Sequence, residues 1–313
     1  MGAAAAPVLA RSQTAAVAWP AKPVKVLVGF PPGQGSDVVA RIFAEDMQRA
    51  LGVPFVIDNR PGAGAMLAAG VVAKSAPDGH TLLFTSSGPF TISPHLYKMD
   101  FESARDLEGV ALLGRSPTLL LANLDFPART VAEMVKMSMA RELDCGSSGY
   151  GITDHLTLEL LKLRSGAKLN HVPYKGSVAS LTDLIGGRLQ MVFASSTSSN
   201  AFVKSGRVKV LAVASADRWR ALPDVPAISE TYPGFEATSW AMMAVPKGTP
   251  EIVRERIAGA LNNSMNTPSV VQALAAAGLE ATPGTSPGAA KAYALAEYSK
   301  WGDVVKRANI KIE

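Results

Sequence analysis

Cysteine and histidine are scarce in this chain of 313 residues. The single cysteine, Cys145, excludes an intramolecular disulfide and any metal site built on a pair of cysteines. The four histidines lie far apart and show no HExxH or other ligand spacing, so we expect no metal centre. No motif calls for a bound cofactor either, and we expect none.

Long hydrophobic runs are absent as well. The best candidate, residues 110–121, is interrupted by Arg115 and Pro117. It therefore falls short of the roughly 18 apolar residues that a membrane-spanning helix needs. The sequence predicts no membrane span.

Aromatic residues make up only 6% of the chain, and its 31 lysines and arginines are scattered without a basic cluster. Both features argue against a nucleic-acid partner, which would require stacking side chains and a basic patch. The net charge of +5 favours attraction of small anions. An ordinary solvated surface explains that charge equally well.

The length predicts two α/β lobes of roughly 100–150 residues each. Residues 1–18 are rich in alanine, and "AAAAPVLA" resembles the tail of an export signal. No positively charged segment precedes it. We therefore expect residues 1–18 to be the remnant of an export leader, with a disordered N-terminus as the alternative.

Strands and helices alternate along the chain. Residues 24–30 predict a strand that is buried on both faces, followed by a loop and a helix with Ser36 as its N-cap and Gly52 just after its end. Repetition of this unit predicts parallel sheets with right-handed crossovers. Segments near 115–122 and 225–240 are expected to cross between the lobes.

Two glycine-containing loops stand between a strand and a helix, one around Gly33 and one at residues 147–149 before Thr153. The N–H groups at a helix N-terminus lack partners and carry partial positive charge, so such loops bind anions. A tight turn explains either loop alone. The presence of one in each lobe favours an anionic ligand between them.

Nucleotide and enzyme motifs fail in detail. The GxGxxG pattern that begins at Gly33 has Val38 at its last position, and "GSSGY" has Tyr150 where the GxSxG motif needs glycine. A hydrolase that uses Ser147 or Ser148 with His155 stays as the alternative function. In that case His155→Ala would lower turnover by orders of magnitude.

Several segments together resemble the Bug/TctC family, the periplasmic solute-binding proteins of tripartite tricarboxylate transporters. They are "WPAKPVKVLVGFPPGQGSDVVAR", "DNRPGAGAMLAAGVVAKSAPDGHTLL", "HVPYKG", "LTDLIGGRLQMVF", "ALPDVPAISE" and "TSWAMMAVPKGTP". They occur in order from Trp19 to about Ile312. The FPPGxGxD loop and HVPYKG are specific in combination, although neither would suffice alone.

The resemblance implies a type II periplasmic-binding-protein fold, with two Rossmann-like lobes joined by crossing hinge strands around a ligand cleft. Residues 19–118 plus 239–313 would form lobe 1, and 119–238 lobe 2. The family is not enzymatic. The resemblance implies a periplasmic monomer with two kinds of partner, a small organic acid anion and the membrane subunits of a tripartite transporter.

The expected ligand-binding residues come from both lobes. They are Phe30, Gly33, Gln34, Gly35, Ser36, Asp37, Ser86, Ser87, Ser147, Ser148, Gly149, Thr153, Tyr174, Ala194 and Ser195. Asp37 would repel an anion, so we expect its carboxylate to accept N–H bonds from the loop and to hold the loop in place.

Position 194 bears on the choice of ligand. Many family members carry an acidic residue there, which can pair with a ligand ammonium, whereas this chain has Ala194 followed by hydroxyl-bearing residues. We therefore expect a carboxylate without an amino group. Dicarboxylates, tricarboxylates and aromatic carboxylates all stay open.

Overall fold

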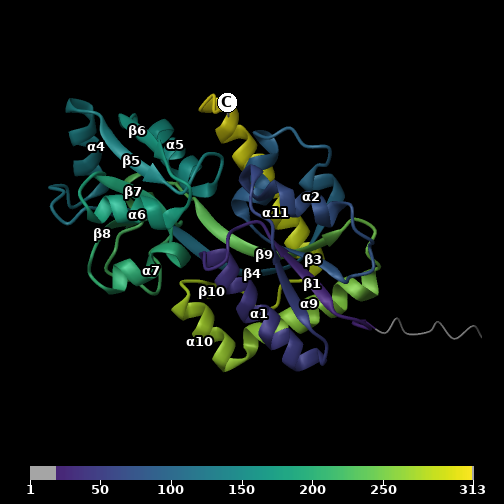
Figure 1. Ribbon diagram of the computed structural model, residues 1–313. Coiled ribbons are helices and arrows are strands. Elements are labelled where there is room, and N and C mark those ends of the chain that lie inside the picture. Colours follow the sequence, from purple (N-terminus) through teal and green to yellow (C-terminus); the bar gives the residue numbers. More distant parts are fainter. Residues whose placement is uncertain (1–18, 312–313) are drawn as a thin grey trace, which may run out of the picture.

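The computed structural model describes residues 19–311 and shows two α/β halves that share one mixed sheet (Figure 1). Among these residues the sheet has ten strands in the order β2-β1-β3-β9-β4-β7-β5-β6, and β8 and β10 also pair with β4. The strands are β1 (Val24–Val28), β2 (Phe55–Asn59), β3 (Thr81–Ser86), β4 (Leu107–Ala122), β5 (Leu143–Ser147), β6 (Leu169–Pro173), β7 (Met191–Ser195), β8 (Lys209–Val213), β9 (Thr238–Pro246) and β10 (Glu280–Ala281).

In each half, helices cover both faces of the sheet (Figure 1). The α-helices are α1 (Gly35–Leu51), α2 (Met66–Ala73), α3 (Ser103–Asp106), α4 (Val131–Ala140), α5 (Thr153–Ser165), α6 (Ser177–Ile185), α7 (Ser196–Lys204), α8 (Ile228–Thr231), α9 (Glu251–Asn266), α10 (Pro268–Ala276) and α11 (Pro287–Arg307). Three short helical turns are η1 (Ala63–Ala65), η2 (Gly88–Ile92) and η3 (Ser93–His95).

The predicted parallel units are confirmed on both sides of the molecule. Strand β1 pairs in parallel with β2 and β3, and β5 pairs in parallel with β6 and β7. The strands between these units, β4 and β9, pair antiparallel with their neighbours. Their apolar residues gave no signal for that direction, because a buried strand has the same composition in either case.

The apolar run in β1 is buried on both faces. Val26 and Val28 pack into the core beneath α1 and α9, whereas Leu27 packs on the other side with residues of α2 and α11. The alternation follows from the two-residue period of a strand, which sends successive side chains to opposite faces. A sheet covered on both sides holds the carboxyl end of β1, and the loop after it, in a fixed position.

Strand β4 links the two halves. It pairs with β9 as far as Pro117, and from Thr118 onward it pairs with β7. The long helix α11 also contacts both halves, since Ala290 lies in a core of the first half and Trp301 in a core of the second. The C-terminal part of α11 therefore contributes to the core of the second half.

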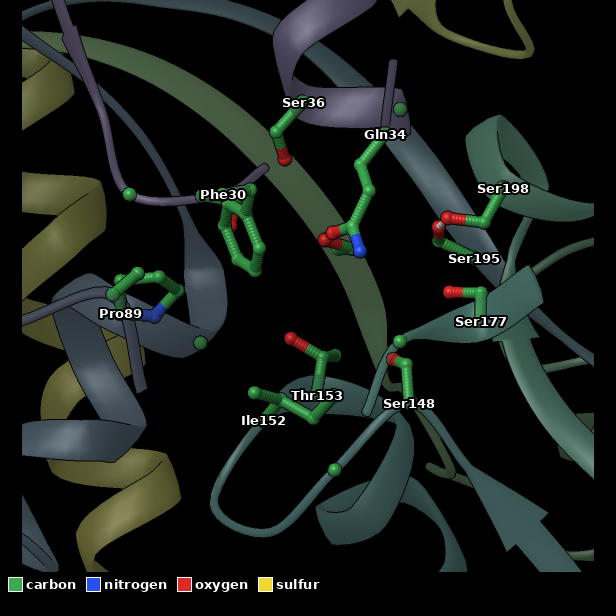
Figure 2. Close-up of a pocket in the computed structure, with 18 of the residues that line it drawn as sticks. Phe30, Gln34, Ser36, Pro89, Ser148, Ile152, Thr153, Ser177, Ser195 and Ser198 are labelled. Carbon is green, nitrogen blue, oxygen red and sulfur yellow. Dashed lines mark hydrogen bonds between the residues drawn. The ribbon is translucent and has the colours of Figure 1, made fainter. Parts of the chain in front are cut away.

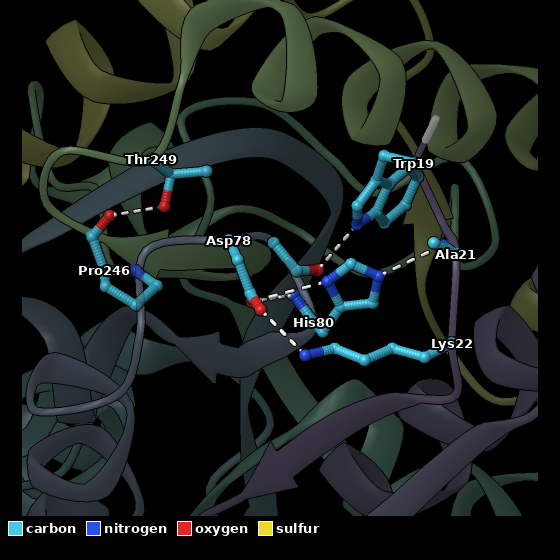
Figure 3. A network of polar contacts seen from close by, with 8 residues as sticks. Trp19, Ala21, Lys22, Asp78, His80, Pro246 and Thr249 are labelled. Carbon is cyan, nitrogen blue, oxygen red and sulfur yellow. Dashed lines mark hydrogen bonds and ion pairs between the residues drawn. The ribbon is translucent and has the colours of Figure 1, made fainter. Parts of the chain in front are cut away.

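The first described residues are tied to the turn before β3 (Figure 3). The Trp19 indole donates to the Gly79 carbonyl at 2.9 Å, and the backbone N–H of Ala21 donates to His80 Nε2 at 3.2 Å. Lys22 pairs with Asp78 at 2.9 Å. These contacts fix the start of β1. The expectation for residues 1–18 lies outside the described residues.

Candidate ligand site

A cavity of about 560 Å³ lies between the two halves, lined by residues from both. The N-terminal ends of four helices reach it: Ser36 in α1, Thr153 in α5, Ser177 in α6 and Ser198 in α7 (Figure 2). Unpaired N–H groups at such ends carry partial positive charge and favour an anion. The volume is that of a typical small-molecule site.

The structure brings most of the expected site residues to this cavity. Those that line it are Phe30, Gln34, Gly35, Ser36, Ser86, Ser148, Gly149, Thr153 and Ser195. Those that do not line it are Gly33, Asp37, Ser87, Ser147, Tyr174 and Ala194. The second group lies behind the cavity wall or beside it, where its members hold other residues in place or fill a core.

Asp37 holds the first glycine loop, as the sequence predicted. Its carboxylate is buried and accepts hydrogen bonds from the Gly33 N–H at 2.8 Å, Arg41 Nε at 2.9 Å and Asn59 Nδ2 at 2.9 Å. Burial works to raise the pKa of Asp37, but these hydrogen bonds together lower it below the ordinary value. Asp37 is therefore ionised at neutral pH and occupied by protein donors.

Ser36 is not the N-cap of α1, contrary to the sequence prediction. The helix begins at Gly35, with Gln34 at the N-cap position and no side-chain cap there. Ser36 is already the second residue of the helix, inside its first turn, whereas an N-cap residue stands just before the helix. The Ser36 side chain makes no hydrogen bond within residues 19–311 and faces the cavity (Figure 2).

The second glycine loop is also held by an acidic residue of the helix that follows it. The Ser148 hydroxyl donates a short hydrogen bond to Asp154, which lies in the first turn of α5. Burial raises the pKa of Asp154 to about 6, and its hydrogen bonds from Ser148 oppose that shift. Asp154 also lines the cavity, but its carboxylate is engaged with Ser148.

The serine–histidine pairs proposed for a hydrolase do not form. His155 is buried and its Nδ1 accepts a hydrogen bond from the Gly151 N–H at 3.2 Å. Ser147 lies 2.6 Å from Nε2 of a different histidine, His171, and its side chain is fully buried. The two imidazole rings stack with their centroids 3.9 Å apart. Neither histidine lines the cavity, so this pair supports the loop from behind.

Ala194 is not a cavity residue, which corrects the argument about a ligand amine. Its side chain is fully buried in an apolar core with Leu119 and Val213. Strand β7 alternates its faces, so the next residue, Ser195, is the one that lines the cavity. Tyr174 is likewise engaged elsewhere, because its hydroxyl donates to Asp183 at 2.8 Å.

Sequence reasoning missed part of the cavity wall. Residues lining it that were not expected include Pro61, Pro89, Ile152, Ser177, Thr197, Ser198 and Ser239. Ser177 and Ser198 were findable, since each stands in the first turn of a helix that follows a strand of the second half. Pro89 and Ile152 carry no comparable signal, because nothing in their local pattern shows that the two halves meet there.

The two halves meet at close range around the cavity. The Ser87 hydroxyl lies 2.7 Å from the Thr153 hydroxyl and 3.1 Å from that of Ser239. A side chain at Gly35 would lie only 2.8 Å from Thr197 Oγ1, across the gap between α1 and α7. These approaches leave little room for larger side chains at Gly35, Ser87 and Thr153.

Among residues 19–311, no three histidine, cysteine, aspartate or glutamate side chains gather as metal ligands would. No helix there combines the length and apolar character of a membrane span.

The family model described as the tripartite tricarboxylate transporter family receptor, TctC, matches residues 39–310. The chain belongs to the TctC family. Family members are solute-binding proteins. The match covers most of the chain, and it confirms the resemblance seen in the sequence.

Several solved structures have the same fold as this member of the TctC family. Rpa4515 of R. palustris, solved with adipate, has a TM-score of 0.87 and 33% identity over 94% of this chain and 99% of that one. The periplasmic binding protein BugD has a TM-score of 0.84 and 30% identity, covering 94% and 100%. MatC from Rhodopseudomonas palustris, with bound malate, has a TM-score of 0.83 and 30% identity over 92% of this chain and 100% of that one. The two-lobed periplasmic-binding-protein fold is confirmed.

Proposed function

We propose that this chain is a periplasmic solute-binding protein that captures an organic carboxylate without an amino group and delivers it to the membrane subunits of a tripartite transporter. The observation that carries the proposal is the cavity between the halves, where the N-terminal ends of α1, α5, α6 and α7 converge. Membership of the TctC family supports the transport role, and the adipate and malate of two relatives support the ligand class.

The expected lobe boundaries, 19–118 plus 239–313 and 119–238, are kept in the proposal with β4 and the start of β9 as hinges. The partner change of β4 between Pro117 and Thr118 supports that boundary. Hinge closure brings the loop of α1 against α7 and Ser87 against Thr153. An open form would separate these pairs and admit the ligand.

The acidic side chains of the cavity lining disfavour a ligand amine. Among the described lining residues the only acidic one is Asp154, and its carboxylate accepts the Ser148 hydroxyl. A ligand ammonium would have to share this one carboxylate with Ser148, and burial disfavours its ionised form by raising the pKa of Asp154 to about 6. Glutarate should therefore bind at least about tenfold more tightly than glutamate, a difference of about 1.4 kcal/mol in binding free energy.

A thermal-shift screen over organic acids tests the proposal. A ligand present at about 100 times its dissociation constant stabilises the folded state by about 2.7 kcal/mol. We expect carboxylates to raise the unfolding midpoint with no turnover of the ligand. Ser198→Ala should weaken that shift, whereas Ser205→Ala, one residue beyond the other end of α7, should leave it unchanged. The proposal fails if no carboxylate raises the midpoint, or if one is chemically converted.

A further inference from the structure

The cavity has two ends of different chemistry (Figure 2). Its polar end is formed by Gln34, Ser148, Ser177, Ser195 and Ser198, and its apolar end by Phe30, Pro89 and Ile152. A ligand that spans the cavity therefore meets hydrogen-bonding groups at one end and hydrocarbon surface at the other.

The polar end is built to receive one anionic group. Ser177 opens α6, and Ser195 is the N-cap of α7, so two helix N-termini face the same space. The Ser195 hydroxyl donates to Ser198 Oγ at 3.0 Å, so the Ser198 hydroxyl proton is left for a ligand. Within residues 19–311 the side chains of Gln34 and Ser177 make no hydrogen bond to protein, so their donors are available to a ligand.

The apolar end has the hydroxyls of Ser36 and Thr153 close by, but it offers no charged donor (Figure 2). Pro31, Pro61 and Pro89 line the cavity, and proline has no backbone N–H to donate. The Phe30 ring points into the cavity (Figure 2). Tyr97 also lines the cavity and contributes a neutral hydroxyl, since burial raises its pKa. This wall can hold an apolar group, or one with a single uncharged polar substituent.

The positions of the charged side chains in the cavity lining also favour an uncharged group at the apolar end. Among the described lining residues no arginine occurs, and the one lysine, Lys175, stands two positions before Ser177 at the polar end. A second carboxylate placed against Phe30 and Pro89 would have no cation beside it. The nearby hydroxyls of Ser36 and Thr153 would offset only part of the cost of removing a second ionised carboxylate from water.

We propose that the ligand is a monocarboxylate with an uncharged apolar chain or ring, and that Phe30 sets this preference. The proposal rests on the carboxylate-binding function proposed above. The carboxylate would occupy the polar end and the hydrocarbon part would pack against Phe30, Pro89 and Ile152. This chain would then differ in preference from its relatives that hold the dicarboxylates adipate and malate.

Titration calorimetry with matched pairs of acids provides the test. Hexanoate and adipate have the same carbon chain and differ by one terminal carboxylate, as do 4-methylbenzoate and terephthalate. We expect the monocarboxylate of the better-binding pair to bind at least about tenfold more tightly than its dicarboxylate. Equal or tighter binding of the dicarboxylate overturns the proposal while leaving carboxylate binding intact.

Two further outcomes separate the proposal from the function on which it rests. If none of the four acids binds and the wider screen also finds no carboxylate ligand, the proposed function itself fails. If hexanamide binds as tightly as hexanoate, recognition of the anionic group fails, and both proposals fall. Weak binding of hexanamide, by contrast, supports the placement of a carboxylate at the polar end.

Variants of Phe30 test which residue sets the preference. Phe30→Arg places a cation at the apolar end and should raise the adipate-to-hexanoate affinity ratio by at least about tenfold. Phe30→Leu keeps the site apolar and should leave hexanoate preferred. Should Phe30→Arg fail to fold, Ile152→Arg puts the same charge on the same end. An unchanged ratio in a folded arginine variant refutes the role assigned to this end of the cavity.

Discussion

Replacing Asp37 with alanine should loosen the first glycine loop and destabilise the protein. Apart from the bond to Arg41, the carboxylate accepts two hydrogen bonds, from the Gly33 N–H at 2.8 Å and from Asn59 Nδ2 at 2.9 Å. Each hydrogen bond to a charged acceptor contributes about 1.5 kcal/mol or more. The ion pair to Arg41 adds less than about 1 kcal/mol, since the Arg41 side chain is 52% exposed. We expect Asp37→Ala to cost about 3 kcal/mol of unfolding free energy.

The same hydrogen bonds predict how stability depends on pH. They lower the folded-state pKa of Asp37 below 3.8, its ordinary value, in spite of the opposing effect of burial. The unfolded chain therefore binds the proton more readily, so the stabilisation is complete above pH 3.8 and is lost as the pH falls through the lower folded value. In Asp37→Ala this part of the acid sensitivity should be missing.

Urea unfolding at pH 7 measures the free energy, and hydrogen exchange at the Gly33 amide measures the loop itself. We expect faster exchange at Gly33 in Asp37→Ala, together with weaker ligand binding. Asp58→Ala is a matched control, because it removes only the partly exposed pair with Arg60 and should cost less than about 1 kcal/mol. Equal stability and equal Gly33 exchange in wild type and Asp37→Ala would show that the carboxylate does not hold the loop.

Three further predictions follow from other contacts. Burial lowers the pKa of His155 to about 3, so the unfolded chain takes up this proton first. The contribution of His155 to stability should therefore fall by about 2 kcal/mol between pH 7 and pH 5, and urea unfolding of wild type and His155→Phe should differ by that amount over this range. The same pH dependence in both proteins would contradict this. Gly35→Ala should weaken ligand binding by at least about tenfold, because its methyl group would lie 2.8 Å from Thr197 Oγ1 and oppose closure. Gly259→Ala, with open space around it, is the control and should bind ligand normally in calorimetry. The Cys145 thiol is fully buried and its pKa is raised by burial, so it should react with a thiol reagent only after unfolding, and fast reaction of the native protein would refute its placement.

The sequence predicted those parts of the molecule that depend on local physics. The strand–loop–helix units and the role of Asp37 follow from periodicity and from the needs of unpaired N–H groups near in sequence. The direction of β4 and β9 does not, because it depends on which half each strand joins. Ala194 shows the same limit at the site. Its neighbour Ser195 lines the cavity, and a shift of one residue in a strand exchanges core for cavity.

The division of the cavity into a polar and an apolar end begins within one loop. Phe30 and Pro31 line the cavity as hydrocarbon, and later in the same segment Gln34 and Ser36 line it as hydrogen-bonding groups. The second half then contributes Ile152 on the side of the cavity where Phe30 lies and Ser195 on the side of the Gln34 amide (Figure 2). Because each end needs residues from both halves, ligand preference is a property of the closed form. Substitutions in this loop should therefore change which acid is bound, whereas those at Asp37 should weaken the binding of every acid alike.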